Sequence, residues 1–332
     1  KARGDAAVTG VRRRVPKSRA MHAAMVIAVG FALIILAGAL LLMLPCAAKS
    51  GRATPFIDAL FTATSATCVT GLVTVSTAVH WSVFGKCVIL LLIQIGGLGF
   101  MSVAAIASFV LRRTITLHER MVMSAGLNLS DGGGIVRLTR RVLFGTFIIE
   151  GTGAVLLSCR FVPHYGFPKG ITMGVFHAVS AFCNAGFDLM GTPDDPFQSL
   201  IGWAEDPLVN ITVMALIVLG GLGFFVWSDV WDKHSFCRLR LHTKIVLTAT
   251  AGLLLFGFGW TLLFEWSNPA TLGAFDTPHK LLAAAFESVT LRTAGFNTID
   301  LGALTGPSQA VSCLLMFIGG SPGSTAGGIK TV

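Results

Sequence analysis

Three short segments of the chain repeat a pattern that could coordinate a cation through backbone carbonyl groups. Each has an aromatic residue, a Ser or Thr four or five residues on, and a glycine that follows a small or hydroxyl residue: FTATSATCVTGLVTV (61–75), FHAVSAFCNAGFDLM (176–190) and FESVTLRTAGFNTI (286–299). Glycine adopts backbone angles closed to other residues, so the carbonyls beside it can point toward one path. Carbonyl oxygens that line such a path replace the water shell of a bare cation.

A second motif follows each of these segments. It reads IQIGGLGF at 93–100, IVLGGLGF at 217–224 and MFIGGSPG at 316–323. The glycines of the first motif, Gly71, Gly186 and Gly295, are 115 and 109 residues apart. Two motifs that recur three times in the same order indicate an internal structural repeat.

The composition places these repeats in a membrane. Of the 332 residues 53% are apolar and only 12% are charged, and the mean hydropathy is +0.75. A soluble domain carries about 25% charged residues. Runs such as 21–44 reach the length of about 20 apolar residues that spans a bilayer. We therefore expect an all-α polytopic membrane protein.

The apolar runs alternate between long and short. Full spans are predicted at 21–44, 86–111, 138–161, 207–228 and 244–265, with a sixth that starts near 308. Shorter apolar pieces lie between them at 56–66, 172–182 and 278–291, each with a proline near its start. They are too short to span and are typical of re-entrant helices. Their C-terminal ends, which carry partial negative charge, would then point at the membrane centre and favour a cation there.

The backbone that joins each short piece to the next span would be irregular at membrane depth. Such backbone is tolerated where protein buries it or where it lines a water-filled path.

The positions of Lys and Arg predict which side of the membrane each connecting segment faces. Eighteen of the 25 lie in residues 1–20, 111–141 and 229–244 or at Lys330. By the positive-inside rule these segments are cytoplasmic, and the short pieces enter from outside. The basic tail resembles a signal-peptide start, but the apolar run after it is too long, so we expect an uncleaved helix.

The last stretch, GGSPGSTAGGIKTV (319–332), interrupts the sixth apolar run. Gly323 and Gly328 have the spacing of a phosphate loop, but Ile329 stands before Lys330 and no soluble α/β domain surrounds the stretch. The expected division is a cytoplasmic tail (1–19), repeat 1 (20–111), a linker (112–137), repeat 2 (138–228), a second linker (229–243) and an incomplete repeat 3 (244–332).

The motifs TSATCVTGL, SAFCNAGF, LRTAGFNT, QIGGLGF and SPGSTAGGIK resemble the Ktr/Trk/HKT potassium transporter superfamily across 20–332, and Ktr-type subunits in particular. The resemblance implies four helix–re-entrant helix–helix units of the potassium-channel type around one pore. Three are visible here, and a fourth is missing from the sequence. The implied activity is potassium uptake across the plasma membrane by a channel-like subunit. Plant relatives associated with sodium carry a serine where this chain has Gly71, so potassium is favoured.

The resemblance also assigns candidate sites. Filter residues that would coordinate the ion are Cys68, Val69, Thr70, Gly71, Cys183, Asn184, Ala185, Gly186, Thr293, Ala294 and Gly295. An intramembrane gate loop is implied at 319–328, namely Gly319, Gly320, Ser321, Pro322, Gly323, Ser324, Thr325, Ala326, Gly327 and Gly328. Potassium would be the only metal, held through filter carbonyls.

The implied partners are a second copy of the chain, a cytosolic nucleotide-binding ring of the KtrA/TrkA kind, and membrane lipid. No nucleic acid, organic cofactor or enzymatic activity is expected, because no catalytic group can be argued at membrane depth. Sodium conduction or sodium coupling within the same superfamily is the alternative. A secondary transporter is disfavoured because its repeats are often inverted, whereas these run parallel.

Four charged side chains in or near the apolar segments call for a partner or a role. Arg292 precedes the third loop, where we expect it to face away from the ion path and tie the loop down, with Glu287 as partner. Glu150 lies deep in a span, where carboxylates are costly; a structural pairing is favoured over a coupling-ion site. Asp58 is expected to cap a re-entrant helix.

Overall fold

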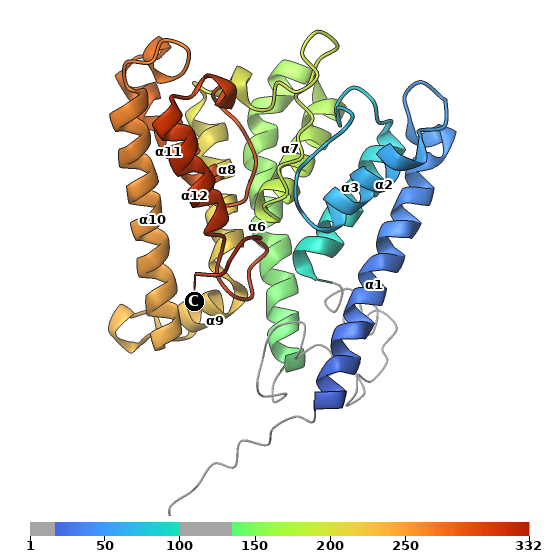
Figure 1. The fold of residues 1–332 in the computed structure, drawn as a ribbon, viewed down its shortest axis with the longest axis horizontal. Helices are drawn as coiled ribbons and strands as arrows, with labels where there is room; N and C mark the ends of the chain where they lie inside the picture. Colours follow the sequence, from blue (N-terminus) through green and yellow to red (C-terminus); the bar gives the residue numbers. More distant parts are fainter. Residues whose placement is uncertain (1–16, 100–134, 332) are drawn as a thin grey trace, which may run out of the picture.

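The computed structural model describes residues 17–99 and 135–331, and this part of the chain is helical (Figure 1). The α-helices are α1 (Lys17–Met43), α2 (Phe56–Thr67), α3 (Val83–Leu98), α6 (Ile135–Tyr165), α7 (Phe167–Phe182), α8 (Pro207–Leu222), α9 (Phe224–Lys233), α10 (Leu241–Glu265), α11 (Thr277–Thr290) and α12 (Gly306–Phe317). Within these ranges no strand forms beyond isolated bridges. The predicted tail 1–19 and linker 112–137 lie almost entirely outside the described residues.

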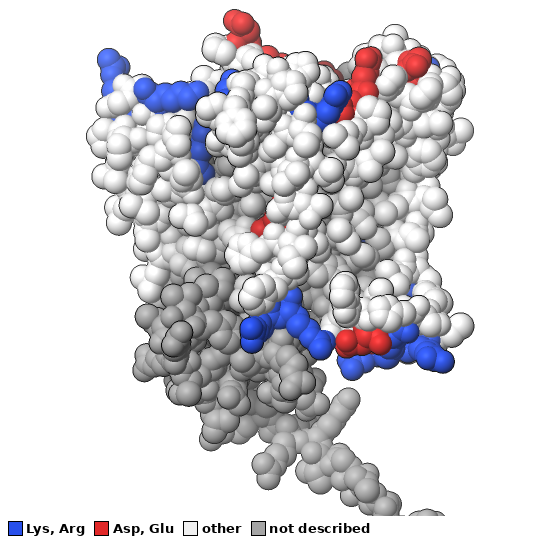
Figure 2. Space-filling view, turned by 180° about the vertical axis from the view of Figure 1, so that it is seen from behind, with Lys and Arg blue, Asp and Glu red and all other residues white. Residues whose placement is uncertain are grey.

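Three long helices have the length and composition to cross a membrane. Their apolar parts are Met25–Met43, Thr139–Tyr165 and Leu241–Glu265. A helix of 25 residues is about 37 Å long, which exceeds the hydrocarbon core of a bilayer. Figure 2 shows charged side chains gathered near the two ends of the molecule, with a broad and largely uncharged belt between them. Exposed Leu33, Phe144 and Leu255 lie on these helices, as a lipid-facing surface requires.

The three short helices form where prolines and short apolar runs predicted them, as α2, α7 and α11. Each packs against the long helix that precedes it, on α1, α6 and α10 respectively. A Cβ added at Gly174 would lie closer than 3.0 Å to Ser158 of α6, so glycine permits this approach. Asp58 lies in the first turn of α2, but Pro55 occupies the N-cap and no side chain caps this helix. The predicted capping role of Asp58 is therefore wrong.

The predicted span 207–228 is formed by two helices with a sharp bend between them. Helix α8 ends at Leu222, and α9 leaves it at an angle of 94°. Gly223 sits at the bend with φ of +91°, a backbone conformation that favours glycine. A Cβ there would stand 2.7 Å from the carbonyl oxygen of Pro322. Glycine therefore permits both the bend and the close approach of a segment about a hundred residues further along.

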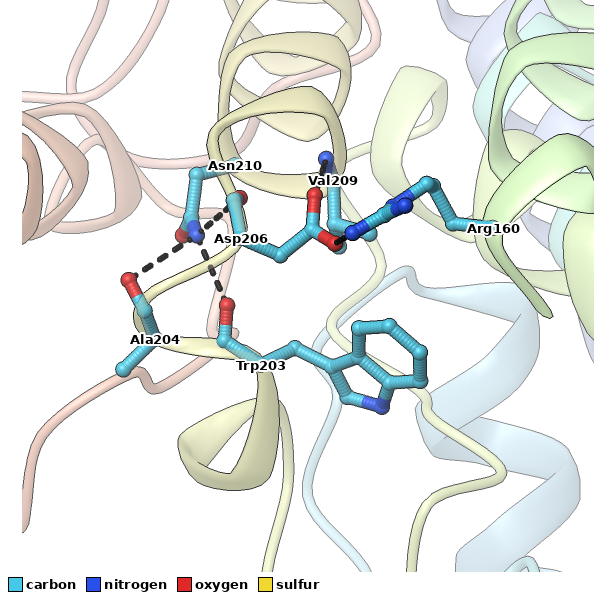
Figure 3. A network of polar contacts seen from close by, with 6 residues as sticks. All are labelled: Arg160, Trp203, Ala204, Asp206, Val209 and Asn210. Carbon is cyan, nitrogen blue, oxygen red and sulfur yellow. Dashed lines mark hydrogen bonds and ion pairs between the residues drawn. The ribbon is translucent and has the colours of Figure 1, made fainter. Parts of the chain in front are cut away.

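A polar network fixes the start of α8 (Figure 3). The carboxylate of Asp206 accepts a hydrogen bond from the backbone N–H of Val209 at 3.1 Å and pairs with the guanidinium of Arg160 on α6, whose Nε is 2.6 Å away. The Asn210 amide donates to the carbonyl oxygens of Trp203, Ala204 and Asp206. An ionised N-cap is favourable at this end of a helix.

Candidate functional site: three glycine loops and a glycine-rich segment

Each short helix runs directly into one of the predicted loops. We name these the first (68–71), second (183–186) and third (293–295) glycine loops, after α2, α7 and α11. Two residues in each loop have positive φ: a non-glycine, then a glycine two positions later. The pairs are Val69 (+57°) and Gly71 (+74°), Asn184 (+56°) and Gly186 (+69°), and Thr293 (+65°) and Gly295 (+86°). Positive φ is costly for Val and Thr, and strain of this kind gathers at functional sites.

The loops contact one another in sequence. A Cβ added to Gly71 would lie closer than 3.0 Å to the carbonyl oxygen of Ala185 in the second loop. A Cβ added to Gly186 would lie 2.5 Å from the carbonyl oxygen of Ala294 in the third loop. In both cases the glycine of one loop lies against the residue that precedes the glycine of the next loop. The structure therefore brings together the three loops that the sequence pattern singled out.

One backbone hydrogen bond recurs in all three loops. The residue before each glycine donates its N–H to the carbonyl oxygen of the hydroxyl residue four positions after the aromatic. The bonds join Thr70 to Ser65 at 2.9 Å, Ala185 to Ser180 at 2.8 Å and Ala294 to Thr290 at 3.0 Å. The third loop keeps this bond although it has one residue fewer between the aromatic and the glycine.

The hydroxyl groups of these same residues hold the loops. Ser180 Oγ donates to the carbonyl oxygen of Phe187, and Thr290 Oγ1 donates to that of Phe296, both at 2.7 Å. In both cases the acceptor is the residue after the loop glycine. The first loop differs, because there Thr70 Oγ1 donates to Ser65 Oγ at 2.9 Å. The repeated Ser or Thr in the sequence motif thus has a local structural role.

The glycine-rich segment 319–328 lies against the bend between α8 and α9. Helix α12 ends at Phe317, which agrees with the predicted interruption of the sixth apolar run. The N–H of Ser321 donates to Gly221 O at 3.0 Å, and the N–H of Thr325 donates to Gly220 O at 3.2 Å. In the other direction, Phe224 N–H donates to Gly323 O at 2.9 Å. Three backbone bonds therefore join this segment to the second motif of repeat 2.

The same segment also contacts the glycine loops. Thr325 Oγ1 donates to the carbonyl oxygen of Phe182, the last residue of α7, at 2.9 Å. The N–H of Gly327 donates to Thr293 Oγ1, in the third glycine loop, at 3.1 Å. The segment thus links the end of α7 with the third loop.

Arg292 ties the third loop to the glycine-rich segment. It is 7% exposed, and its Nη2 donates to the carbonyl oxygen of Gly319 at 3.1 Å. The predicted pairing with Glu287 is wrong: among the described residues neither carboxylate oxygen of Glu287 has a hydrogen-bond partner. Glu287 belongs to α11, whereas Arg292 follows the end of that helix and turns toward the segment.

Glu150 makes a structural pairing, the favoured one of its two predicted roles. Its side chain is buried in α6, and Gln94 Nε2 of α3 lies 3.1 Å from both carboxylate oxygens. Cys183 Sγ, at the start of the second loop, is 3.9 Å from Oε1. Sequence reasoning did not single out Gln94; the available signal was an amide in an apolar run where the second copy of the motif has Val218.

His177 links α7 to the segment that follows the second glycine loop. It is fully buried on α7, and its Nδ1 lies 2.7 Å from the carbonyl oxygen of Met173. The N–H of Leu189 donates to Nε2 at 3.2 Å, so this network places the ring proton on Nδ1. Across residues 17–99 and 135–331 no cluster of His, Cys, Asp or Glu suits a metal ion.

Long apolar helices around a set of converging glycine loops define a helical membrane protein. The family model for TrkH, described as cation transport protein, matches residues 7–332, so the chain belongs to this family. It is 43% identical over 324 residues to the potassium/sodium uptake protein NtpJ of Enterococcus hirae, with 98% of this chain and 70% of that protein covered. It is 44% identical over 305 residues to the Ktr system potassium uptake protein B of Bacillus subtilis, with coverages of 92% and 67%.

A solved structure shares the fold. The potassium transporter TrkH from Vibrio parahaemolyticus matches with a TM-score of 0.68 at 17% sequence identity, over 96% of this chain and 60% of that one. The chain thus spans 60–70% of the length of the proteins compared here.

Proposed function

We propose that this chain is the potassium-translocating part of an uptake system in the plasma membrane, and that the three glycine loops are sides of its selectivity filter. The observation that carries this proposal is the repeated contact of Gly71 with Ala185 and of Gly186 with Ala294. Such contacts are expected of strained loops that surround a common path. The names of relatives, which include potassium uptake proteins from two bacteria, support the same ion.

The physical basis is that carbonyl oxygens of the loops compensate a potassium ion for the water it loses on entering the filter. Each loop follows the end of a helix, at Thr67, Phe182 and Thr290, directly in the first two loops and after two residues in the third. The C-terminal end of a helix carries partial negative charge, so three such ends beside one path favour a cation. Loop carbonyls then replace water around potassium. Repeats 20–111, 138–228 and 244–332 would each supply one such side.

The glycine-rich segment 319–328 is proposed as the gate. Its hydrogen bonds to Phe182 and Thr293 attach it to the end of α7 and to the third glycine loop, where it would obstruct the path. Its glycines lower the cost of alternative backbone states. Arg292 would hold the segment in the obstructing position through Gly319.

Charge supports a cytoplasmic location for the end that carries α9 and the starts of α6 and α10. Arg140, Arg141, Lys233, Arg238 and Arg240 lie there, and α2, α7 and α11 would then enter from outside. The resemblance to Ktr-type subunits implies assembly with a second copy and a cytosolic nucleotide-binding ring, and we include both in the proposal. The name of NtpJ keeps sodium as the second candidate ion.

The proposal is tested by ion flux into proteoliposomes that hold the full gene product. We expect potassium or rubidium influx well above sodium influx. Equal influx of both ions would favour the sodium alternative. Absence of any influx from folded protein, with its regulatory partner added, would contradict a conducting role.

A further inference from the structure

Helix α9 lies crosswise at one end of the molecule. It leaves α8 at 94°, beside the first turns of α10 (Figure 1). Because α8 follows the direction in which the long helices cross the membrane, a right-angled turn at its end places α9 along the membrane surface. Its ten residues, Phe224–Lys233, contain four large aromatics.

Several apolar side chains are exposed at this end. Trp231 is 78% exposed and Val230 41%, and beyond the helix Phe236 is 53% and Leu241 74% exposed. We call these four residues the α9 surface. Tryptophan is enriched where a protein meets the headgroup region of a bilayer, and an amphipathic helix with such a face lies in that interface.

Cations are interleaved with the apolar residues of the α9 surface. Lys233, Arg238, Arg240 and Lys244 lie within 233–244, and Lys244 Nζ stands 5.8 Å from the Phe236 ring centre. Two carboxylates offset part of this charge. Asp229 pairs with Lys233 at 2.9 Å and with Arg240 at 3.6 Å, and Asp232 pairs with Arg141 at 3.4 Å. The balance remains positive, and Arg238 is exposed with no ion pair to another described residue.

We propose that the α9 surface binds the anionic phospholipids of the leaflet it faces, with Trp231 among the headgroups and Arg238 on a lipid phosphate. Positive charge next to an exposed tryptophan matches an anionic lipid surface in both its polar and its apolar part. A regulatory protein is the other occupant that such a surface could take, and the experiment below separates the two.

The α9 surface is also joined to the segment proposed as the gate. Phe224, the first residue of α9, donates its N–H to Gly323 O at 2.9 Å. A Cβ added at Gly323 would meet the ring of Phe225 at 2.8 Å, so the segment rests on the first turn of α9. Lipid that holds α9 in place therefore holds the gate segment in the position seen here. This second part rests on the proposed function of that segment.

Fluorescence quenching by lipid tests the binding part alone. The full protein is placed in nanodiscs of phosphatidylcholine with or without phosphatidylglycerol, and either lipid is brominated. The contribution of Trp231 is the difference between the parent and W231F. We expect brominated phosphatidylglycerol to quench it more strongly than brominated phosphatidylcholine, and Arg238→Gln to reduce that preference.

Trp260, which lies within α10, is partly exposed and has no cation over its ring among the described residues, supplies the control through W260F. Its contribution should be quenched without regard to lipid charge. A Trp231 signal that neither lipid quenches, or that both lipids quench equally, overturns the proposal. A signal that only an added cytosolic ring protein changes would assign the surface to that protein instead.

Rubidium flux tests the link to the gate. In vesicles with phosphatidylglycerol, W231F and R238Q should raise flux by about 2- to 30-fold, the range that mutations coupling two sites produce. In phosphatidylcholine alone they should match the parent. Lipid-dependent quenching with unchanged flux would overturn the link and leave the lipid site standing. If the parent itself does not select potassium over sodium, that result would count against the filter assignment rather than against the link between lipid and gate.

Discussion

Gly71 and Ala185 lie so close that a Cβ on the glycine would approach the carbonyl oxygen of Ala185 to less than 3.0 Å. They are 114 residues apart in the chain and belong to different repeats. Gly186 and Ala294 stand in the same relationship one repeat later. The three glycine loops therefore form one packed unit, and we expect a change in the backbone of one loop to alter the backbone of the loop it contacts.

Gly186→Ala should disturb this unit. The new Cβ would lie 2.5 Å from Ala294 O, at a φ of +69° that costs a non-glycine residue about 1–3 kcal/mol. We expect a lower thermal unfolding temperature in detergent and a reduced ratio of potassium to sodium flux. Gly51→Ala is the matched control, because Gly51 has a φ of +68° but no atom within 4 Å of an added Cβ. Equal effects of the two variants would show that loop contact is unimportant.

Thr290→Val should loosen the third loop. It removes the hydroxyl that donates to Phe296 O and leaves that buried acceptor without a donor, at a cost of about 1–3 kcal/mol. Thr290→Ser keeps the hydroxyl and should behave like the parent. The measurement is sodium leak through reconstituted protein. A leak of the same size in both variants would assign the effect to lost packing rather than to the hydrogen bond.

Thr325→Val should weaken the attachment of the glycine-rich segment proposed as the gate. The variant loses the hydrogen bond to Phe182 O but keeps the shape of the side chain. Rubidium flux should rise, and deletion of residues 321–327 should raise it further. Thr325→Ser serves as control because its hydroxyl can make the same bond. Flux that falls in the deletion would contradict the assignment of this segment as the gate.

Exchanging the side chains of Gln94 and Glu150 together should preserve their hydrogen bond, whereas changing Glu150 alone should remove it. Glu150→Ala leaves the partly buried amide of Gln94 without its partner and should cost about 1–3 kcal/mol of stability. The double variant Gln94→Glu with Glu150→Gln restores an amide–carboxylate pair in the opposite sense. Thermal unfolding of both variants checks this. If the exchanged pair is no more stable than Glu150→Ala, the two side chains do not act together.

The sequence predicts the short helices well because their signals are local. Proline near the first turn and an apolar run of limited length are enough to predict α2, α7 and α11. The loop residues were found because the same hydroxyl and glycine recur three times. The recurrence carries the information that a single copy would lack.

Tertiary contacts explain the failures. Gly220, Gly221 and Gly223 permit a bend after Leu222, but the sequence does not show that one forms or that the carbonyl oxygen of Pro322 packs against Gly223 there. Arg292 and Glu287 are close enough in sequence to suggest an ion pair, yet the Arg292 guanidinium donates its hydrogen bond to the backbone carbonyl oxygen of Gly319. The partner of Glu150 comes from a different repeat. Each of these depends on how the repeats pack together, which local patterns do not encode.

The most direct test of the filter assignment compares Gly71→Ser with Gly51→Ser in potassium and sodium flux into proteoliposomes. Both glycines have positive φ, +74° and +68°, but only Gly71 contacts another loop, since no atom lies within 4 Å of a Cβ added at Gly51. If the glycine loops select the ion, Gly71→Ser lowers the potassium-to-sodium ratio and Gly51→Ser leaves it unchanged. A folded Gly71→Ser variant with the selectivity of the parent would contradict the account.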